Sequence, residues 1–201
     1  MNHSLSASKA DAIGVLILEE FASFQAKTLI EFVGHSKEIP RQYLRWCDSS
    51  TRPEEGFYSQ YGRCDFVVGE KNVDLHLFDL PTSLLPDFNL GDLIFPVEVR
   101  GCLLLANQDV NPSTWRRDRF PGWLNWIQAQ KTPYLVAVTR SDSPVLPVNE
   151  FLSYLSLKPE TQIVELPAHH VGTSWLDHVF ETTDVKRVLT MLTENILANM
   201  T

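Results

Sequence analysis

The sequence has no long apolar run and few cysteines. A membrane-spanning helix needs about 20 consecutive apolar residues, and no apolar run in the 201 residues approaches that length, so we expect no membrane span. The three cysteines, Cys47, Cys64 and Cys102, are widely spaced. An odd number of cysteines without a pattern argues against a disulfide framework and favours the reducing cytoplasm as the compartment.

Basic charge is also scarce, because 17 Lys and Arg face 25 Asp and Glu and give a formal net charge of −8. Phosphate backbones are bound by clustered Lys and Arg, and the one basic cluster, residues 116–119, is interrupted by Asp118. Nucleic acid is therefore not expected as a partner. The first 11 residues lack the apolar stretch of a signal peptide. They are expected to be a disordered lead-in to a single domain over residues 12–201.

The sequence does contain an alternation of short apolar runs with helical patterns. Six runs have the composition of β-strands, at residues 13–18, 66–68, 73–78, 102–106, 134–138 and 163–166. Apolar residues at helical spacing predict helices over residues 115–129, 148–157 and 184–199. Thr183 or Asp184 is the expected N-cap of the last. The alternation predicts an α/β fold with a six-stranded, mostly parallel sheet and helices on both faces. The short connection at residues 69–72 predicts a hairpin, which supplies one antiparallel edge strand.

Two long segments, residues 36–61 and 82–95, lack clear periodicity. Irregular segments of this length in a compact domain are usually functional. The first contains large aromatic side chains in a polar context, and exposed aromatic groups mark contact sites. We therefore predict a protein-binding surface that includes Tyr43, Trp46, Phe57 and Tyr58.

The connection after the first predicted strand, residues 19–28, is where a nucleotide-binding α/β domain holds phosphates. The phosphate-loop pattern is G-x-x-x-x-G-K-[ST], in which glycines let the backbone wrap the anion, Lys reaches the outer phosphates and a hydroxyl holds Mg²⁺. Lys27 and Thr28 match the end of that pattern, whereas Phe21 and Ala26 stand at the two glycine positions. A Cβ at a position that needs positive φ costs about 1–2 kcal/mol. This loop is therefore poorly suited to phosphate.

Acidic residues follow three of the predicted strands. Glu19 and Glu20 begin the phosphate-loop segment, where they would repel an anion. Asp79 follows the third strand, and Asp142 follows the fifth. Each aspartate has two open interpretations, as a ligand-binding group or as a cap of a helix or turn.

Over residues 12–198 the order and spacing of these motifs resemble the small GTPase family. The resemblance is closest to bacterial members of the gliding-motility-switch type and to the β subunit of the signal recognition particle receptor. Residues 73–82 resemble the family's strand plus D-x-P-G, and Asp79 matches the aspartate that holds Mg²⁺ through water. Thr82 and Ser83 replace the glycine that senses the γ-phosphate and the residue that is often the water-orienting glutamine.

Further motifs extend the resemblance along the chain. Residues 136–142 resemble the guanine-reading N-K-x-D, with Asp142 kept and Thr139 and Arg140 in place of Asn and Lys. Ala168 follows the sixth strand, where the family has S-A-K. Residues 58–63, Tyr-Ser-Gln-Tyr-Gly-Arg, resemble the end of switch I, and by that alignment the switch threonine is lost.

The resemblance implies a three-layer P-loop GTPase-like fold with a defined set of site residues. The nucleotide would contact Lys27, Thr28, Thr139, Asp142 and Ala168, and Mg²⁺ would be held by Thr28 and Asp79. The family's partners are often small roadblock- or longin-type regulators. The oligomeric state is left open.

Several catalytic parts are replaced together, so the favoured interpretation is a pseudo-GTPase that serves as a signalling or scaffold protein-binding module. It would hydrolyse little or no GTP and carry no cofactor. The alternative is a divergent but working GTPase that binds GTP or GDP and Mg²⁺ through Lys27, Thr28, Asp79 and Asp142. A third interpretation is a receiver domain with Asp79 as phosphoacceptor. The length of the chain and the Thr139-Arg140 pair, where such domains keep a Lys, argue against it.

Overall fold

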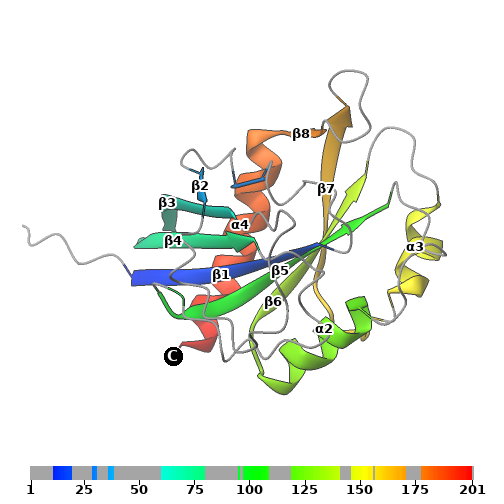
Figure 1. The fold of residues 1–201 in the computed structure, drawn as a ribbon, viewed down its shortest axis with the longest axis horizontal. Coiled ribbons are helices and arrows are strands. Elements are labelled where there is room, and N and C mark those ends of the chain that lie inside the picture. The colour runs from blue at the N-terminus through cyan, green and yellow to red at the C-terminus, as the bar shows by residue number, and fades with distance from the viewer. Residues whose placement is uncertain are drawn as a thin grey trace, which may run out of the picture.

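The protein is an α/β domain built on one mixed β-sheet (Figure 1). The computed structural model describes residues 11–19, 29–30, 36–38, 60–79, 95, 97–108, 119–140, 146–155, 157–170 and 178–200. Within these ranges no helix is both long and apolar enough to cross a membrane.

Six long strands form the body of the sheet, in the spatial order β3 (Gln60–Val68), β4 (Lys71–Asp79), β1 (Asp11–Glu19), β5 (Val99–Asn107), β6 (Tyr134–Arg140) and β7 (Ile163–His170). They correspond to the six predicted strands. From β4 through β1, β5 and β6 to β7, every neighbouring pair is parallel. Among the six, β3 and β4 form the one antiparallel pair, which confirms the predicted hairpin.

Two strands of three residues each extend the sheet at its margins. β2 (Ser36–Glu38) pairs antiparallel with the start of β3, and β8 (His178–Phe180) pairs antiparallel with the end of β7. The antiparallel hairpin strand β3 was predicted to be an edge strand of the sheet. This prediction is wrong, because β2 lies outside β3. Residues 36–61 were expected to be irregular. That prediction is wrong at both ends of the segment, because it begins with β2 and ends in β3.

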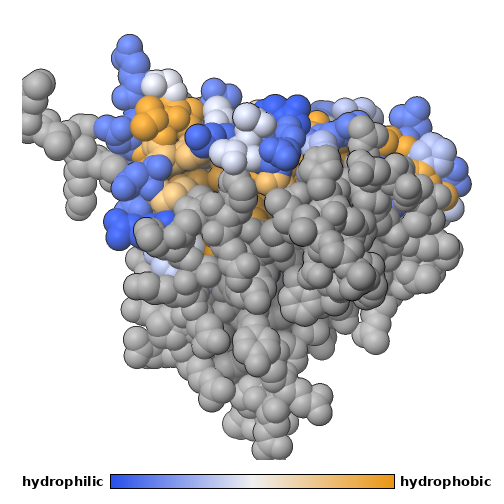
Figure 2. Space-filling model, turned by 90° about the horizontal axis from the view of Figure 1, so that it is seen from above, coloured by the Kyte–Doolittle hydropathy of each residue, from blue (hydrophilic) through white to orange (hydrophobic). Residues whose placement is uncertain are grey.

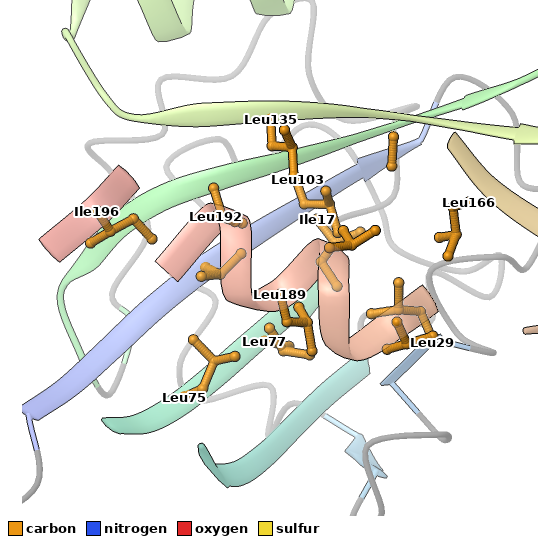
Figure 3. Packing of buried hydrophobic residues seen from close by; sticks show 14 of the residues in the cluster. Ile17, Leu29, Leu75, Leu77, Leu103, Leu135, Leu166, Leu189, Leu192 and Ile196 are labelled. Atoms are coloured by element: carbon orange, nitrogen blue, oxygen red, sulfur yellow. The ribbon is translucent and has the colours of Figure 1, made fainter. Parts of the chain in front are cut away.

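The central strand β1 is buried on both faces, which explains its continuous apolar run. Alternate residues of β1 face the helix α4 (Thr182–Asn199), whose apolar stripe packs across the sheet together with Leu29 and Ile30 (Figure 3). The stripe is that expected from the sequence and comprises Val185, Leu189, Leu192 and Ile196, each 2% exposed or less. The remaining apolar residues of β1 contribute to a second core on the opposite face.

The second core lies under α2 (Arg119–Ala129) and α3 (Val148–Tyr154). Trp123, Leu124 and Ile127 of α2 and Phe151 of α3 pack there on side chains of β1, β5 and β6. Helices on both faces of the sheet are thereby confirmed. In the view of Figure 2, hydrophobic residues of the described part are visible between hydrophilic ones.

Helix boundaries differ from the sequence expectations by a few residues. α2 is described from Arg119, so Pro121 falls in its first turn, where a missing N–H costs little. α4 begins at Thr182, and its N-cap is Glu181, which makes no side-chain capping bond; the expected caps Thr183 and Asp184 lie inside the helix. Asp11 belongs to β1, so the expected lead-in is one residue too long at that end; residues 1–10 lie outside the described part.

Gly14 marks a very close approach between β1 and the segment that enters β5. Its N–H donates a hydrogen bond of 2.9 Å to the Glu98 carbonyl oxygen. A Cβ added at Gly14 would lie 2.7 Å from that same oxygen, a backbone atom that cannot rotate away. The register of β1 against β5 also shifts between Gly14 and Val15. Only a residue without a side chain fits here.

We expect Gly14→Ala to lower the free energy of unfolding by about 1–3 kcal/mol, the usual cost of forcing an extra carbon into a packed site. Urea denaturation followed by circular dichroism would measure it. Gly122→Ala is the matched control, because nothing lies within 4 Å of a Cβ at this exposed position of α2. There the change should be neutral or stabilise by up to about 1 kcal/mol. Equal stability of the two variants would contradict this account of the β1–β5 contact.

Candidate functional site

The carboxyl ends of β1, β4, β5 and β6 meet along one side of the sheet, which we call the carboxyl edge. The parallel register places Asp79 opposite Ile17 and Thr139 opposite Asn107, so these strands end close together. Ligands of open α/β sheets bind outside the carboxyl ends of the strands. The carboxyl edge is therefore the first place to look for a functional site.

Buried polar side chains concentrate at this edge. The described residues include seven buried polar or charged side chains, and five of them end or follow these strands: Glu19, Asp79, Asn107, Gln108 and Thr139. Each of the five is 7% exposed or less. Because burying a polar group is costly without good partners, such a concentration is typical of functional sites. We therefore take these five residues as the candidate site.

Glu19 and Asp79 place two carboxyl groups at the ends of neighbouring strands. Both residues are 7% exposed. Burial, and after it the charge of Glu19, raises the pKa of Asp79 to about 8. Desolvation disfavours the ionised form of Asp79, and a second carboxylate disfavours it further. Asp79 is therefore largely protonated at neutral pH, and this part of the edge is unfavourable for an anion.

The ends of β5 and β6 are joined by hydrogen bonds that use the other polar residues. The backbone N–H of Gln108 donates to the Thr139 carbonyl oxygen at 2.8 Å. The Gln108 side-chain amide donates to the carbonyl oxygen of Leu146, and the Thr139 hydroxyl donates to the carbonyl of Ala106 at 3.5 Å. The Oε1 atom of Gln108 is buried without a hydrogen-bond partner among the described residues. It is an acceptor that a ligand's donor group could satisfy.

The structure brings two of the predicted site residues, Asp79 and Thr139, to the carboxyl edge. Ala168 lies in β7, where its backbone pairs with Phe180 of β8. The remaining predictions fall outside the described residues: Lys27, Thr28 and Asp142 of the nucleotide set, and Tyr43, Trp46, Phe57 and Tyr58 of the partner surface. Their roles stay predictions. Leu29 and Ile30, which follow Thr28 directly, are helical and fully buried against the sheet.

Sequence reasoning missed Asn107 and Gln108, and it read Glu19 only as a surplus negative charge. The available signal was positional, since Asn107 and Gln108 are the first polar residues after an apolar run that forms a buried strand. Whether a metal ion fits depends on donor number. Glu19 and Asp79 offer two carboxyl groups, and the described part of the chain contains no group of three or more His, Cys, Asp or Glu placed to hold a metal ion.

The raised pKa of Asp79 predicts a pH-dependent stability. The native state holds the proton of this carboxyl more tightly than the unfolded chain, whose aspartates titrate near their ordinary value of about 4. The unfolding free energy therefore falls as pH rises from about 4 to about 8, by up to about 1.4 kcal/mol per pH unit. Asp79→Asn removes this dependence. Its unfolding free energy, relative to that of the wild type, should therefore rise by about 3 kcal/mol as the pH increases from 5 to 8.

Urea denaturation of both proteins at pH 5, 6, 7 and 8 would measure this difference. Asp65→Asn is the control, because Asp65 is an exposed carboxylate on the neighbouring strand β3. This variant keeps the Asp79 carboxyl, so it should keep the fall in stability with pH that Asp79→Asn loses. Parallel pH curves for wild type and Asp79→Asn would contradict the burial and charge coupling described above.

Comparison with known proteins adds no family to this picture. No known protein-family model matches the chain, and no curated protein matches it. The functional conclusion therefore depends on the residues of this chain and their arrangement.

Proposed function

We propose that the chain is a degenerate small-GTPase-like domain, a pseudo-GTPase, which acts as a protein-binding module in signalling or scaffolding. One observation carries the proposal. Where a nucleotide-binding sheet would receive phosphates, this sheet buries two carboxyl groups, Glu19 and Asp79, that act on one another.

The arrangement of strands and helices is compatible with a GTPase-like fold and supports the proposal at the level of fold class. The mixed sheet has β1 near its middle, an antiparallel hairpin partner beside β4 and helices on both faces. A P-loop GTPase-like fold has these features. The segment from Glu19 to Thr28 then becomes the remodelled phosphate loop, with Phe21 and Ala26 in place of glycines.

Electrostatics argue against tight binding of a nucleotide at the carboxyl edge. Two unit charges about 5 Å apart interact by about 3 kcal/mol at an effective dielectric constant of about 20. A negative charge shared by Glu19 and Asp79 would therefore weaken the binding of an adjacent phosphate by about 100-fold. Phe21 and Ala26, in place of the loop glycines, carry side chains that hinder the close backbone approach through which N–H groups could offset this repulsion. With the loop glycines and the switch glycine replaced, little transition-state stabilisation is left for phosphoryl transfer.

One observation favours the second candidate function, a divergent GTPase. Carboxylate oxygens are the ligands that Mg²⁺ prefers, and Mg²⁺ would reverse the sign of the local field. Glu19 and Asp79 could then bind nucleotide through the metal, with Lys27, Thr28 and Asp142 completing the site. The two functions differ in a direct way, because the GTPase requires Mg²⁺-dependent and guanine-selective binding.

The proposed protein contact is the aromatic segment around Tyr43, Trp46, Phe57 and Tyr58. Its two flanks are described: Ser36–Glu38 of β2 pairs with Gln60–Gly62 of β3, so the ends of the segment are held side by side at the margin of the sheet. A segment anchored in this way can present side chains to a partner without disturbing the core. A small roadblock- or longin-type regulator is the proposed partner class.

Titration with fluorescent GDP and GTP, with and without Mg²⁺, tests the proposal. We expect no saturable binding up to millimolar nucleotide for the wild type. Glu19→Gln should bind more tightly than the wild type by up to about 100-fold because it removes one negative charge. Glu181→Gln, which neutralises an exposed carboxylate outside the edge, is the matched control and should leave binding unchanged.

Micromolar binding that needs Mg²⁺, prefers guanine and is lost in Lys27→Ala or Asp79→Asn would overturn the proposal in favour of the GTPase.

A further inference from the structure

The β3–β4 hairpin carries a chain of four polar side chains that the proposed function does not use. Arg63 and Tyr61 come from β3, and Asp74 and His76 come from β4. Side chains alternate between the faces of a strand. Since the intervening residues Val73, Leu75 and Leu77 pack under α4, the polar chain lies on the opposite face of the sheet.

The four side chains contact one another in a row, from the Arg63 guanidinium at one end to the Tyr61 phenol at the other. Arg63 donates two hydrogen bonds to the Asp74 carboxylate, from Nε at 2.7 Å and from Nη2 at 2.8 Å. Asp74 Oδ2 lies 3.2 Å from His76 Nε2, in a contact that is not aligned as a hydrogen bond. His76 Nδ1 lies 2.7 Å from the Tyr61 hydroxyl oxygen. Cross-strand pairing fixes this order, because His76 is directly opposite Arg63.

The charges in this chain select the tautomer of His76. The Arg63 guanidinium, through its hydrogen bonds, lowers the pKa of Asp74, so this carboxylate is ionised. A carboxylate near Nε2 favours the proton on that nitrogen and leaves the lone pair on Nδ1. The Tyr61 hydroxyl then donates its hydrogen bond to Nδ1. A hydroxyl on one ring nitrogen of a histidine and a carboxylate near the other is the arrangement that activates a nucleophile.

The surroundings shield the base and leave the phenol partly exposed. His76 is 7% exposed, whereas Tyr61 is only partly buried. The ring of Tyr61 lies 5.4 Å from that of Phe78, and Phe78 lies 4.8 Å from Phe95, so apolar rings border this part of the face. Water has little access to a base in such a setting, so it competes less with His76 for the phenolic proton.

We propose that Tyr61 is a nucleophile for acyl transfer, with His76 as its general base and Asp74, held by Arg63, as the residue that positions His76. The substrate class is an activated ester. The Tyr61 oxygen forms a bond to the acyl carbon while the bond from that carbon to the leaving oxygen breaks. The phenolic proton moves to His76 Nδ1 and from there to the leaving oxygen. The product is an acyl-tyrosine, and the step involves neither Glu19 nor Asp79.

p-Nitrophenyl acetate is the probe, and peptide mass spectrometry follows acetylation of each tyrosine with time. Tyr154, on α3, is the internal reference because it is 47% exposed. General base catalysis contributes about 10²–10⁴-fold, so Tyr61 should acetylate at least about 10-fold faster than Tyr154 despite its greater burial. A hydroxyl that only braces the hairpin would react more slowly than Tyr154, and that result would overturn the proposal.

Substitutions of His76 and Asp74 distinguish general base catalysis from a purely structural role of the Tyr61–His76 contact. His76→Gln keeps a hydrogen-bond acceptor but cannot take the proton, so the ratio of Tyr61 to Tyr154 acetylation should fall at least about 10-fold. Asp74→Asn should lower the same ratio, and Asp74→Glu should restore most of it. An unchanged ratio in both His76→Gln and Asp74→Asn would overturn the proposal. If His76→Gln fails to fold, the wild-type ratio and the Asp74 pair decide the outcome.

Discussion

The burial of β1 on both faces constrains the rest of this molecule. A parallel strand in the middle of a sheet must be covered on both sides, and here α4 covers one face of β1 while α2 and α3 cover the other. The same burial extends to the carboxyl end of the strand, where Glu19 is enclosed beside Asp79 of the neighbouring β4. The pair of buried carboxyl groups on which the proposed function rests is thus a consequence of the packing that makes the fold.

Much of the fold could be predicted because each buried strand appears as a continuous apolar run and each helix as a 3.6-residue pattern. The strand predictions that were wrong concern segments whose structure depends on pairing with a neighbouring strand more than on their own composition. β2 is the polar tripeptide Ser36–Glu38, and it is a strand because it lies beside β3. The first two thirds of β3, residues 60–65, were missed for a related reason, since Arg63 and Asp65 are exposed and interrupt the apolar pattern. α4 begins ahead of its expected caps, and its N-cap uses backbone geometry without a side-chain bond.

The candidate site could be predicted only in part. Asp79 and Thr139 were found because they follow apolar runs and match a motif order. Asn107 and Gln108 were missed because their position directly after an apolar run does not by itself show that they are buried. Their burial depends on the neighbouring strands and on the Leu146 carbonyl. The contact of Tyr61 with His76 depends on the antiparallel register of the hairpin, which residue spacing alone does not specify.

Burial and the charge of Glu19 raise the pKa of Asp79 to about 8, so Asp79 is a buried acid that is largely protonated at neutral pH. Carbon-13 NMR of the Asp79 carboxyl carbon over pH 3–10, in wild type and in Glu19→Gln, tests it most directly. We expect a midpoint near pH 8 in the wild type, a lower midpoint in Glu19→Gln, and no change on adding GTP and Mg²⁺. A wild-type midpoint near the ordinary aspartate value of about 4, or one that drops on adding Mg²⁺ and GTP, would contradict it.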